Sequence, residues 1–226
     1  MENDRSSLIS LLTLVMAAAL FCTGCPKPDD AKKKGDALER KAAVSKTDEA
    51  ASVKPVKPVE PPPKPTIPEV ALTEDNADTC VIKVGGTIPN AALVDLAGRP
   101  VELKSLFGKK LTVICFWNGS QTSGLQAIQE LQKYIADQYA SKGVNVIGIN
   151  IGDAQPAVSK QVALAEVKYP VLLDPQGEYF SKVATKMLPR VYLLDENGKV
   201  LWFDIEYSRS MRRDLQQGIQ VVLGEI

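Results

Sequence analysis

Two apolar runs, 111–117 and 144–151, constrain the fold of this chain more than any other feature. Each run is nearly continuous, which is typical of a β-strand that is buried on both faces. The stretch between them carries apolar residues at helical spacing and then Gly143, a residue type that often ends a helix. The apolar stripe consists of Leu125, Ile128, Leu131 and Ile135. A strand–helix–strand order of this size predicts two parallel strands joined by a right-handed crossover.

Shorter elements surround this unit. Apolar alternation on either side of Ala97-Gly98-Arg99 predicts one hairpin, and Asn197-Gly198 predicts a second. Ser123 is expected to cap the central helix, with Gln126 completing a capping box. The remaining elements are a helix over 156–165, a short segment over 169–173 and an amphipathic helix over 210–223. The order predicts an α/β fold in which helices flank a central mixed sheet, preceded by an N-terminal hairpin.

Composition excludes several function classes. The chain has 226 residues with 27 basic and 27 acidic side chains, so no strong field attracts nucleic acid. It has no histidine, which removes the commonest transition-metal ligand and every Ser-His or Cys-His catalytic pair. Its cysteines are too few for a disulfide scaffold: Cys22, Cys25, Cys80 and Cys115. We therefore expect no nucleic-acid partner, no metal and no cofactor.

The N-terminus is predicted to be a targeting segment. Arg5 precedes an apolar stretch over 8–21, about the length of a signal-peptide core. The stretch ends in Cys22-Thr23-Gly24-Cys25, which resembles a bacterial lipobox. Residues 1–24 would then be a lipoprotein signal peptide, and a lipidated Cys25 would hold the protein at a membrane of the cell envelope. The alternative is an uncleaved anchor helix, which also predicts an exported and tethered protein.

Residues 25–79 are rich in proline, lysine and alanine and poor in large apolar side chains. Such a segment buries too little surface to offset chain entropy, so it is expected to be a disordered linker. Its section 54–65 favours polyproline II, which makes a stiff spacer between membrane and domain. A proline-binding partner is the alternative use. The folded domain is expected over 80–226.

Five stretches in this region resemble one known family. They are Val84–Pro89, Leu103–Lys109, Cys115–Trp117, Tyr169–Asp174 and Leu188–Val200. In content and order they are similar to the TlpA/ResA-like and AhpC/TSA redoxin group of exported proteins. The resemblance implies a thioredoxin-like fold over residues 80–226.

The same resemblance places the family's reactive cysteines at positions where this chain has none. The motif Phe-Trp-x-x-Trp-Cys-x-x-Cys puts the two thiols at Gln121 and Gly124, and a peroxiredoxin alignment puts its thiol at Leu125. Disulfide exchange needs one reactive thiolate and a second thiol to resolve the mixed disulfide. The resemblance thus implies the fold without the family's chemistry.

Cys80 and Cys115 leave three alternatives open. Cys115, inside a buried strand, is most simply a small apolar core residue. The two cysteines could also form a disulfide, or one of them could be redox-active.

Pro189 is the part of the family's site that remains. The resemblance implies a cis proline whose neighbouring backbone pairs with a substrate peptide. Trp117, Gln121 and Leu188 would line that site, and Arg190 would add a charge to it. The alternative is that Pro189 serves only the turn into the following strand.

Three functions compete. The first is a membrane-tethered, redox-inactive thioredoxin-like module that binds or scaffolds an envelope protein or peptide. The second is a thiol-disulfide oxidoreductase or peroxidase that uses Cys80, Cys115 or a partner's thiol. The third is a structural lipoprotein whose linker is the working part.

Overall fold

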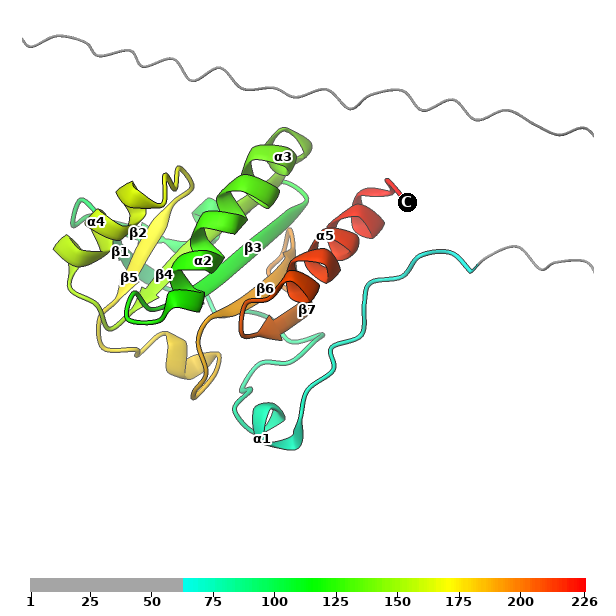
Figure 1. The fold of residues 1–226 in the computed structure, drawn as a ribbon, viewed down its shortest axis with the longest axis horizontal. Helices are drawn as coiled ribbons and strands as arrows, with labels where there is room; N and C mark the ends of the chain where they lie inside the picture. The colour runs from blue at the N-terminus through cyan, green and yellow to red at the C-terminus, as the bar shows by residue number, and fades with distance from the viewer. Residues whose placement is uncertain (1–62) are drawn as a thin grey trace, which may run out of the picture. The chain divides into compact units, whose positions relative to one another are not determined.

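A computed structural model describes residues 63–226, and Figure 1 shows their fold. A seven-stranded mixed sheet forms the centre, in the order β2-β1-β5-β4-β3-β6-β7. The strands are β1 (Ala92–Asp95), β2 (Pro100–Glu102), β3 (Leu111–Trp117), β4 (Val144–Ile151), β5 (Val171–Asp174), β6 (Arg190–Asp195) and β7 (Val200–Ile205). This confirms the predicted α/β fold with an N-terminal hairpin, β1-β2, at one edge of the sheet.

The predicted strand–helix–strand unit is confirmed. β3 and β4 pair in parallel with Leu111 opposite Val144, and β4 pairs in parallel with β5. Helix α2 (Thr122–Leu131) connects the first pair and α4 (Gln155–Leu164) connects the second. Together with the last helix, α5 (Arg209–Leu223), they cover one face of the sheet (Figure 1).

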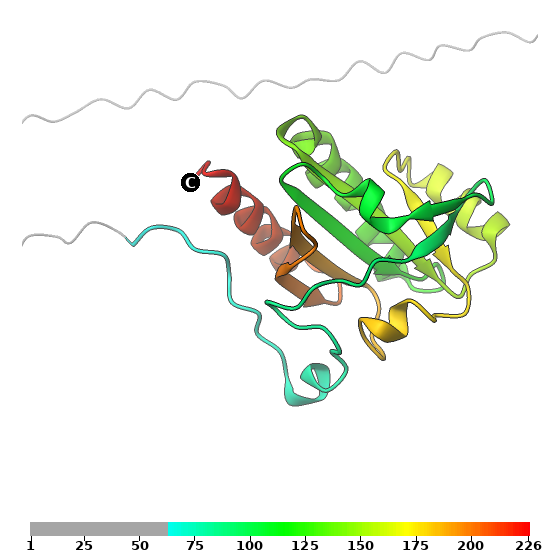
Figure 2. The same ribbon diagram turned by 180° about the vertical axis from the view of Figure 1, so that it is seen from behind.

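Side chains of β3 alternate between two buried layers, which explains why the run is continuously apolar. Cys115 and Trp117 point into the layer under α2, α4 and α5. Ile114 and Phe116 point into the opposite layer. That layer is covered by the stretch between α1 (Glu74–Ala77) and β1, by η1 (Leu103–Leu106) and by η4 (Phe180–Lys182), as seen from behind in Figure 2.

The central helix differs from the prediction at its start. Gln121 is the N-cap residue and makes no side-chain capping bond, so Ser123 does not cap the helix and no capping box forms. The physical reason is that the helix begins earlier than predicted. The N–H groups of Gly124 and Leu125 both donate to the carbonyl of Gln121. The end of the helix agrees with the prediction. It continues through η2 (Gln132–Ala136), α3 (Asp137–Tyr139) and η3 (Ala140–Lys142) and ends at Gly143, whose φ of 88° favours glycine.

Residues 66–79 differ from the expected linker. Gln217 on α5 donates to the carbonyl of Thr66 over 3.0 Å, and Ile67 and Val70 pack against the helix-side core. Thr73 caps α1 through its hydroxyl. Their few apolar side chains are partly buried against the two core layers, so tertiary contacts supply the burial that the segment lacks by itself. We refer to residues 66–72 as the strap.

The remaining predictions for the N-terminal part lie outside the described residues. They are the signal peptide over 1–24, the lipidated Cys25 and the linker up to residue 62. Within residues 63–226, no helix has the length and hydropathy needed to cross a membrane.

Candidate functional site

The register of the sheet brings two predicted site segments to the same end of the molecule. Phe116 near the end of β3 pairs with Arg190 at the start of β6. The turn over 118–121 and the loop over 186–189 therefore lie at this end, where α2 also begins. In the family that the sequence resembles, this is the place of the reactive thiols.

The structure shows what occupies the two thiol positions. Gln121 is exposed and precedes the first turn of α2. Gly124 is buried, and a Cβ atom added to it would lie 2.5 Å from the carbonyl oxygen of Asn118. A cysteine at position 124 would therefore require the backbone of the turn to move. Leu125, the third candidate position, packs at the margin of the core.

Polar groups that the sequence analysis missed hold this turn in place. The Asp153 carboxylate accepts from the N–H of Gly119 over 2.7 Å and from the Asn150 amide over 2.8 Å. Asn118 donates to the carbonyl of Ile151 over 2.7 Å, and Gln161 on α4 donates weakly to the carbonyl of Gly119. One sequence feature does indicate these residues: Asn150 and Asp153 lie at the carboxyl end of a buried parallel strand, where α/β sheets often place polar sites.

The loop before β6 supplies the other half of the site. The Leu188-Pro189 peptide bond is cis, as the resemblance implies. Pro189 itself is buried and its carbonyl accepts from the N–H of Glu206 over 2.9 Å. Met187 has a φ of 68°, which is uncommon for a residue other than glycine, and its side chain is 38 % exposed. The accessible residues of the predicted site are thus Gln121 and half-buried Leu188, and exposed Met187, which the sequence did not predict as a site residue, lies next to Leu188.

Trp117 does not line that surface. Its side chain is fully buried in the helix-side core, because it alternates with Phe116 along β3 and shares the layer of Cys115. Its indole nitrogen has no hydrogen-bond partner and faces Gly148 of the neighbouring strand. The prediction that Trp117 lines the site is therefore wrong. Its side chain packs in the core beneath the site.

Arg190 does not add a charge to that surface either. It is fully buried, and its side chain points to the opposite layer, which it shares with Tyr192. Its Nε donates to the carbonyls of Lys186 and Met187 over 2.8 and 2.9 Å. Its Nη1 donates to the sulfur of Cys80 over 3.2 Å, and its Nη2 bonds to the hydroxyl of Thr79. We call Thr79, Cys80, Arg190 and Tyr192 the arginine cluster.

The two thiols among the described residues, Cys80 and Cys115, lie in different environments. Cys80 and Cys115 are both free and buried, in the two layers on opposite faces of the sheet. Burial among apolar side chains raises the pKa of the Cys115 thiol. Cys115 is thus the apolar core residue that the sequence predicts, and no disulfide joins it to Cys80.

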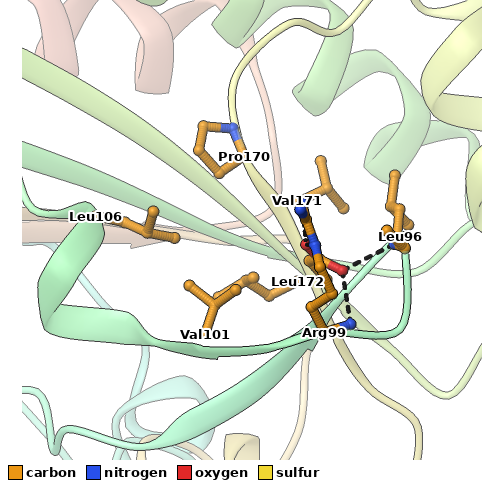
Figure 3. Close-up of a pocket in the computed structure, with 9 residues that line it drawn as sticks. Leu96, Arg99, Val101, Leu106, Pro170, Val171 and Leu172 are labelled. Atoms are coloured by element: carbon orange, nitrogen blue, oxygen red, sulfur yellow. Dashed lines mark hydrogen bonds and ion pairs between the residues drawn. The ribbon is translucent and has the colours of Figure 1, made fainter.

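One apolar hollow lies away from all predicted site residues. Figure 3 shows it between the first hairpin and the start of β5, with Val101 and Leu106 on one side and Pro170 and Val171 on the other. Arg99 at its margin is paired with Asp95 over 2.7 Å, so its charge is compensated. Among residues 63–226, no group of three acidic, cysteine or histidine side chains is placed to hold a metal ion.

Comparison with known proteins agrees with this geometry. The family model described as "Redoxin" matches residues 83–219. A thiol-disulfide oxidoreductase ResA of Bacillus thuringiensis subsp. konkukian is 29 % identical over 120 residues, which cover 53 % of this chain and 68 % of that protein. A ResA of Bacillus cereus is 29 % identical over 125 residues, covering 55 % of this chain and 71 % of the relative.

Solved structures show the same fold. A protein from Chlorobium tepidum described as a thiol:disulfide interchange protein DsbE superposes with a TM-score of 0.58 at 26 % identity, covering 63 % of this chain and 99 % of that chain. A protein from Bacteroides thetaiotaomicron described as a protein disulfide isomerase superposes with a TM-score of 0.59 at 23 % identity, covering 65 % and 93 %. The fold is thioredoxin-like, and the chain belongs to the redoxin family.

Proposed function

We propose that this protein is a membrane-tethered module of the bacterial cell envelope that binds an extended peptide segment of another envelope protein without exchanging disulfides. The observation that carries the proposal is the pair Gln121 and Gly124 at the start of α2, where the resemblance of this chain to the redoxin family places two thiols. The lipobox-like Cys22–Cys25 stretch supports the tether, through a lipidated Cys25.

Disulfide exchange is disfavoured by what surrounds the two described thiols. A partner's disulfide must reach a thiolate in line with its sulfur–sulfur bond, and a second thiol must follow. Cys115 is fully buried with a raised pKa, and Cys80 lies in the other layer, so neither can resolve a mixed disulfide formed on the other.

A binding role remains compatible with the site. Met187 presents an unbranched, adaptable apolar side chain next to Leu188, and Gln121 adds an amide that both donates and accepts. Asp153 and Arg190 fix the turn and the loop that carry these residues. Preorganised segments of this kind lower the entropic cost of binding a peptide.

A second candidate function is thiol-disulfide oxidoreductase or peroxidase activity through Cys80, Cys115 or a partner's thiol. It is favoured by the relatives, which are described as thiol-disulfide oxidoreductases. A third, a spacer lipoprotein, would place the function in the linker predicted over residues 25–79.

An insulin-reduction assay distinguishes the peptide-binding module from the oxidoreductase. We expect the full chain to reduce no insulin disulfides above a control without protein. Turnover that is lost on Cys80→Ser or Cys115→Ser would replace the binding proposal with the oxidoreductase.

Site-specific crosslinking tests binding directly. A photoreactive residue at Gln121 should capture an envelope protein in cells, whereas the same residue at Gln129, an exposed glutamine further along α2, should not. Equal capture at both positions, or capture by residues 1–62 fused to an unrelated domain, would contradict the proposal and favour the spacer function.

A further inference from the structure

The strap is held on the domain by few contacts. Among residues 63–226, its one hydrogen bond to the rest of the domain runs from the Gln217 amide to the carbonyl of Thr66. Ile67 lies over Gly218 of α5, 3.7 Å from where a Cβ atom of that glycine would be. The three large apolar side chains of the strap are half-buried: Ile67, Val70 and Leu72. A segment with so few contacts has low local stability, so it can leave the domain while the core stays folded.

The strap leads directly into α1, and α1 leads into the arginine cluster. Figure 1 shows the strap running beside α5 toward α1. Thr73, the residue after the strap, caps α1 by accepting from the N–H of Asn76 over 3.3 Å. The carbonyl of Asn76 accepts in turn from the Thr79 hydroxyl over 2.6 Å and from the Cys80 thiol over 3.3 Å. The position of α1 therefore sets the position of these two side chains.

The loop of the proposed peptide site depends on the same segment. The N–H of Thr185 donates to the carbonyl of Thr79 over 2.9 Å. Arg190 bonds to the Thr79 hydroxyl through Nη2, and its Nε donates to the carbonyls of Lys186 and Met187. Met187 has a φ of 68°, and a residue other than glycine keeps such a backbone only where its surroundings enforce it. Loosening these contacts therefore changes the shape of the loop.

We propose that the strap regulates the peptide site. While the strap is docked on α5, the loop over 185–188 keeps the shape that binds a peptide, and release of the strap loosens the loop. That the loop binds a peptide rests on the proposed function, whereas its coupling to the strap does not. Because coupling between two sites is reciprocal, a peptide bound to the loop favours the docked strap by the same factor.

The place of the strap in the chain suits this role. In sequence it joins the predicted linker to the domain, so a pull on the linker reaches the strap before any later part of the chain. The docked and released states differ in the contacts of the strap with α5, and α1 and Arg190 connect these contacts to the loop.

The effect should be confined to the part of the loop that α1 and Arg190 hold. The N–H groups of Val81 and Ile82 both donate to the carbonyl of Val183, over 3.1 and 3.0 Å. These bonds involve neither the strap nor α1, so both amides should keep their hydrogen-exchange rates when the strap leaves.

Two charge-matched variants of the full chain release the strap or leave it docked. Ile67→Asp puts a carboxylate at a half-buried position against the core, whereas Ala71→Asp puts the same charge at an exposed position of the strap. Cleavage after Glu69 by a glutamate-specific protease measures release, because a protease needs a stretch of chain clear of the surface. We expect cleavage to be about tenfold faster in Ile67→Asp and unchanged in Ala71→Asp.

Amide hydrogen exchange then measures the loop. The Thr185 N–H should exchange about threefold faster in Ile67→Asp than in Ala71→Asp or the unchanged protein. If Ile67→Asp leaves the strap docked, a glycine-serine replacement of residues 66–72 removes the docking contacts and should give the same faster exchange. Release of the strap without faster exchange at Thr185 would overturn the proposal, and so would an equal effect of Ala71→Asp.

Crosslinking separates this regulation from the proposed function itself. Capture of an envelope protein by a photoreactive residue at Gln121 should fall about threefold in Ile67→Asp and persist in Ala71→Asp. Unchanged capture together with faster exchange at Thr185 would overturn the regulation and leave the binding function standing. Faster exchange in Ile67→Asp, with no capture at Gln121 even in the unchanged protein, would support the coupling and contradict the binding function.

Discussion

Cys115 and Cys80 are both buried, on opposite faces of the same sheet, and their surroundings differ in kind. Cys115 lies among apolar side chains under α2 and α5, and its sulfur has only a 4.0 Å contact to the carbonyl of Phe116. Cys80 accepts a hydrogen bond from Arg190 and donates one to the carbonyl of Asn76 over 3.3 Å. Neighbouring charge and hydrogen bonds, rather than burial alone, therefore distinguish the two thiols.

The largest effect should come from removing the charge that distinguishes the two faces. Arg190→Ala leaves the carbonyls of Lys186 and Met187 and the hydroxyl of Thr79 without a donor, and it opens a cavity. We expect a loss of about 3 kcal/mol in the free energy of unfolding, measured by urea denaturation. Arg190→Met fills the volume without the charge and should cost less. A loss below about 1 kcal/mol for Arg190→Ala would mean that the cluster does not hold the loop.

The same substitution at the two thiols gives the next contrast. A serine at position 115 puts a hydroxyl into the apolar layer without a partner at bonding distance, so Cys115→Ser should cost about 2 kcal/mol. A serine at position 80 keeps both hydrogen-bond partners, so Cys80→Ser should cost under about 1 kcal/mol. Equal losses in urea denaturation would show that the two sites are energetically alike.

The sequence predicted the elements well because their periodicity is strong. The continuous runs of β3 and β4 and the stripe of α2 depend on short-range order alone, and their prediction is confirmed. A strand that is apolar on both sides, however, does not say which layer each residue enters. The resemblance therefore places Trp117 at the surface, although it shares the buried layer of Cys115.

Long-range contacts explain the other differences. Arg190 follows Pro189 directly, which predicts a shared surface, but its partners include Thr79 and Cys80, more than a hundred positions earlier in the chain. The strap residues Ile67 and Val70 are isolated apolar side chains whose partial burial depends on the distant core, and Ile67 lies beside Gly218 of α5. The turn before α2 is set by Asp153 on the neighbouring connection, so local capping rules did not predict it.

Alkaline pH tests the apolar surroundings of Cys115. Cysteine in an unfolded chain loses its proton near pH 8.5, whereas burial raises the pKa of Cys115 in the folded protein. Above about pH 8.5 the unfolded state binds fewer protons, so stability is complete below this pH and falls above it by up to about 1.4 kcal/mol per unit. Urea denaturation between about pH 8.5 and 10 should show a shallower fall for Cys115→Ala. An unchanged slope would mean that this thiol does not contribute.

The smallest effect concerns one hydroxyl on each face. Tyr169 on the helix side donates to the carbonyl of Ile128 over 2.9 Å, whereas Tyr192 on the other side has no partner. Tyr169→Phe should therefore lower the free energy of unfolding by about 1 kcal/mol, and Tyr192→Phe should leave it within about 0.5 kcal/mol. Thermal or urea unfolding of the two variants under reducing conditions measures the difference. If Tyr192→Phe cost as much as Tyr169→Phe, its hydroxyl would already be bonded in the reduced protein. Arg190, whose neighbouring charge lowers the pKa of Tyr192, would then be its partner.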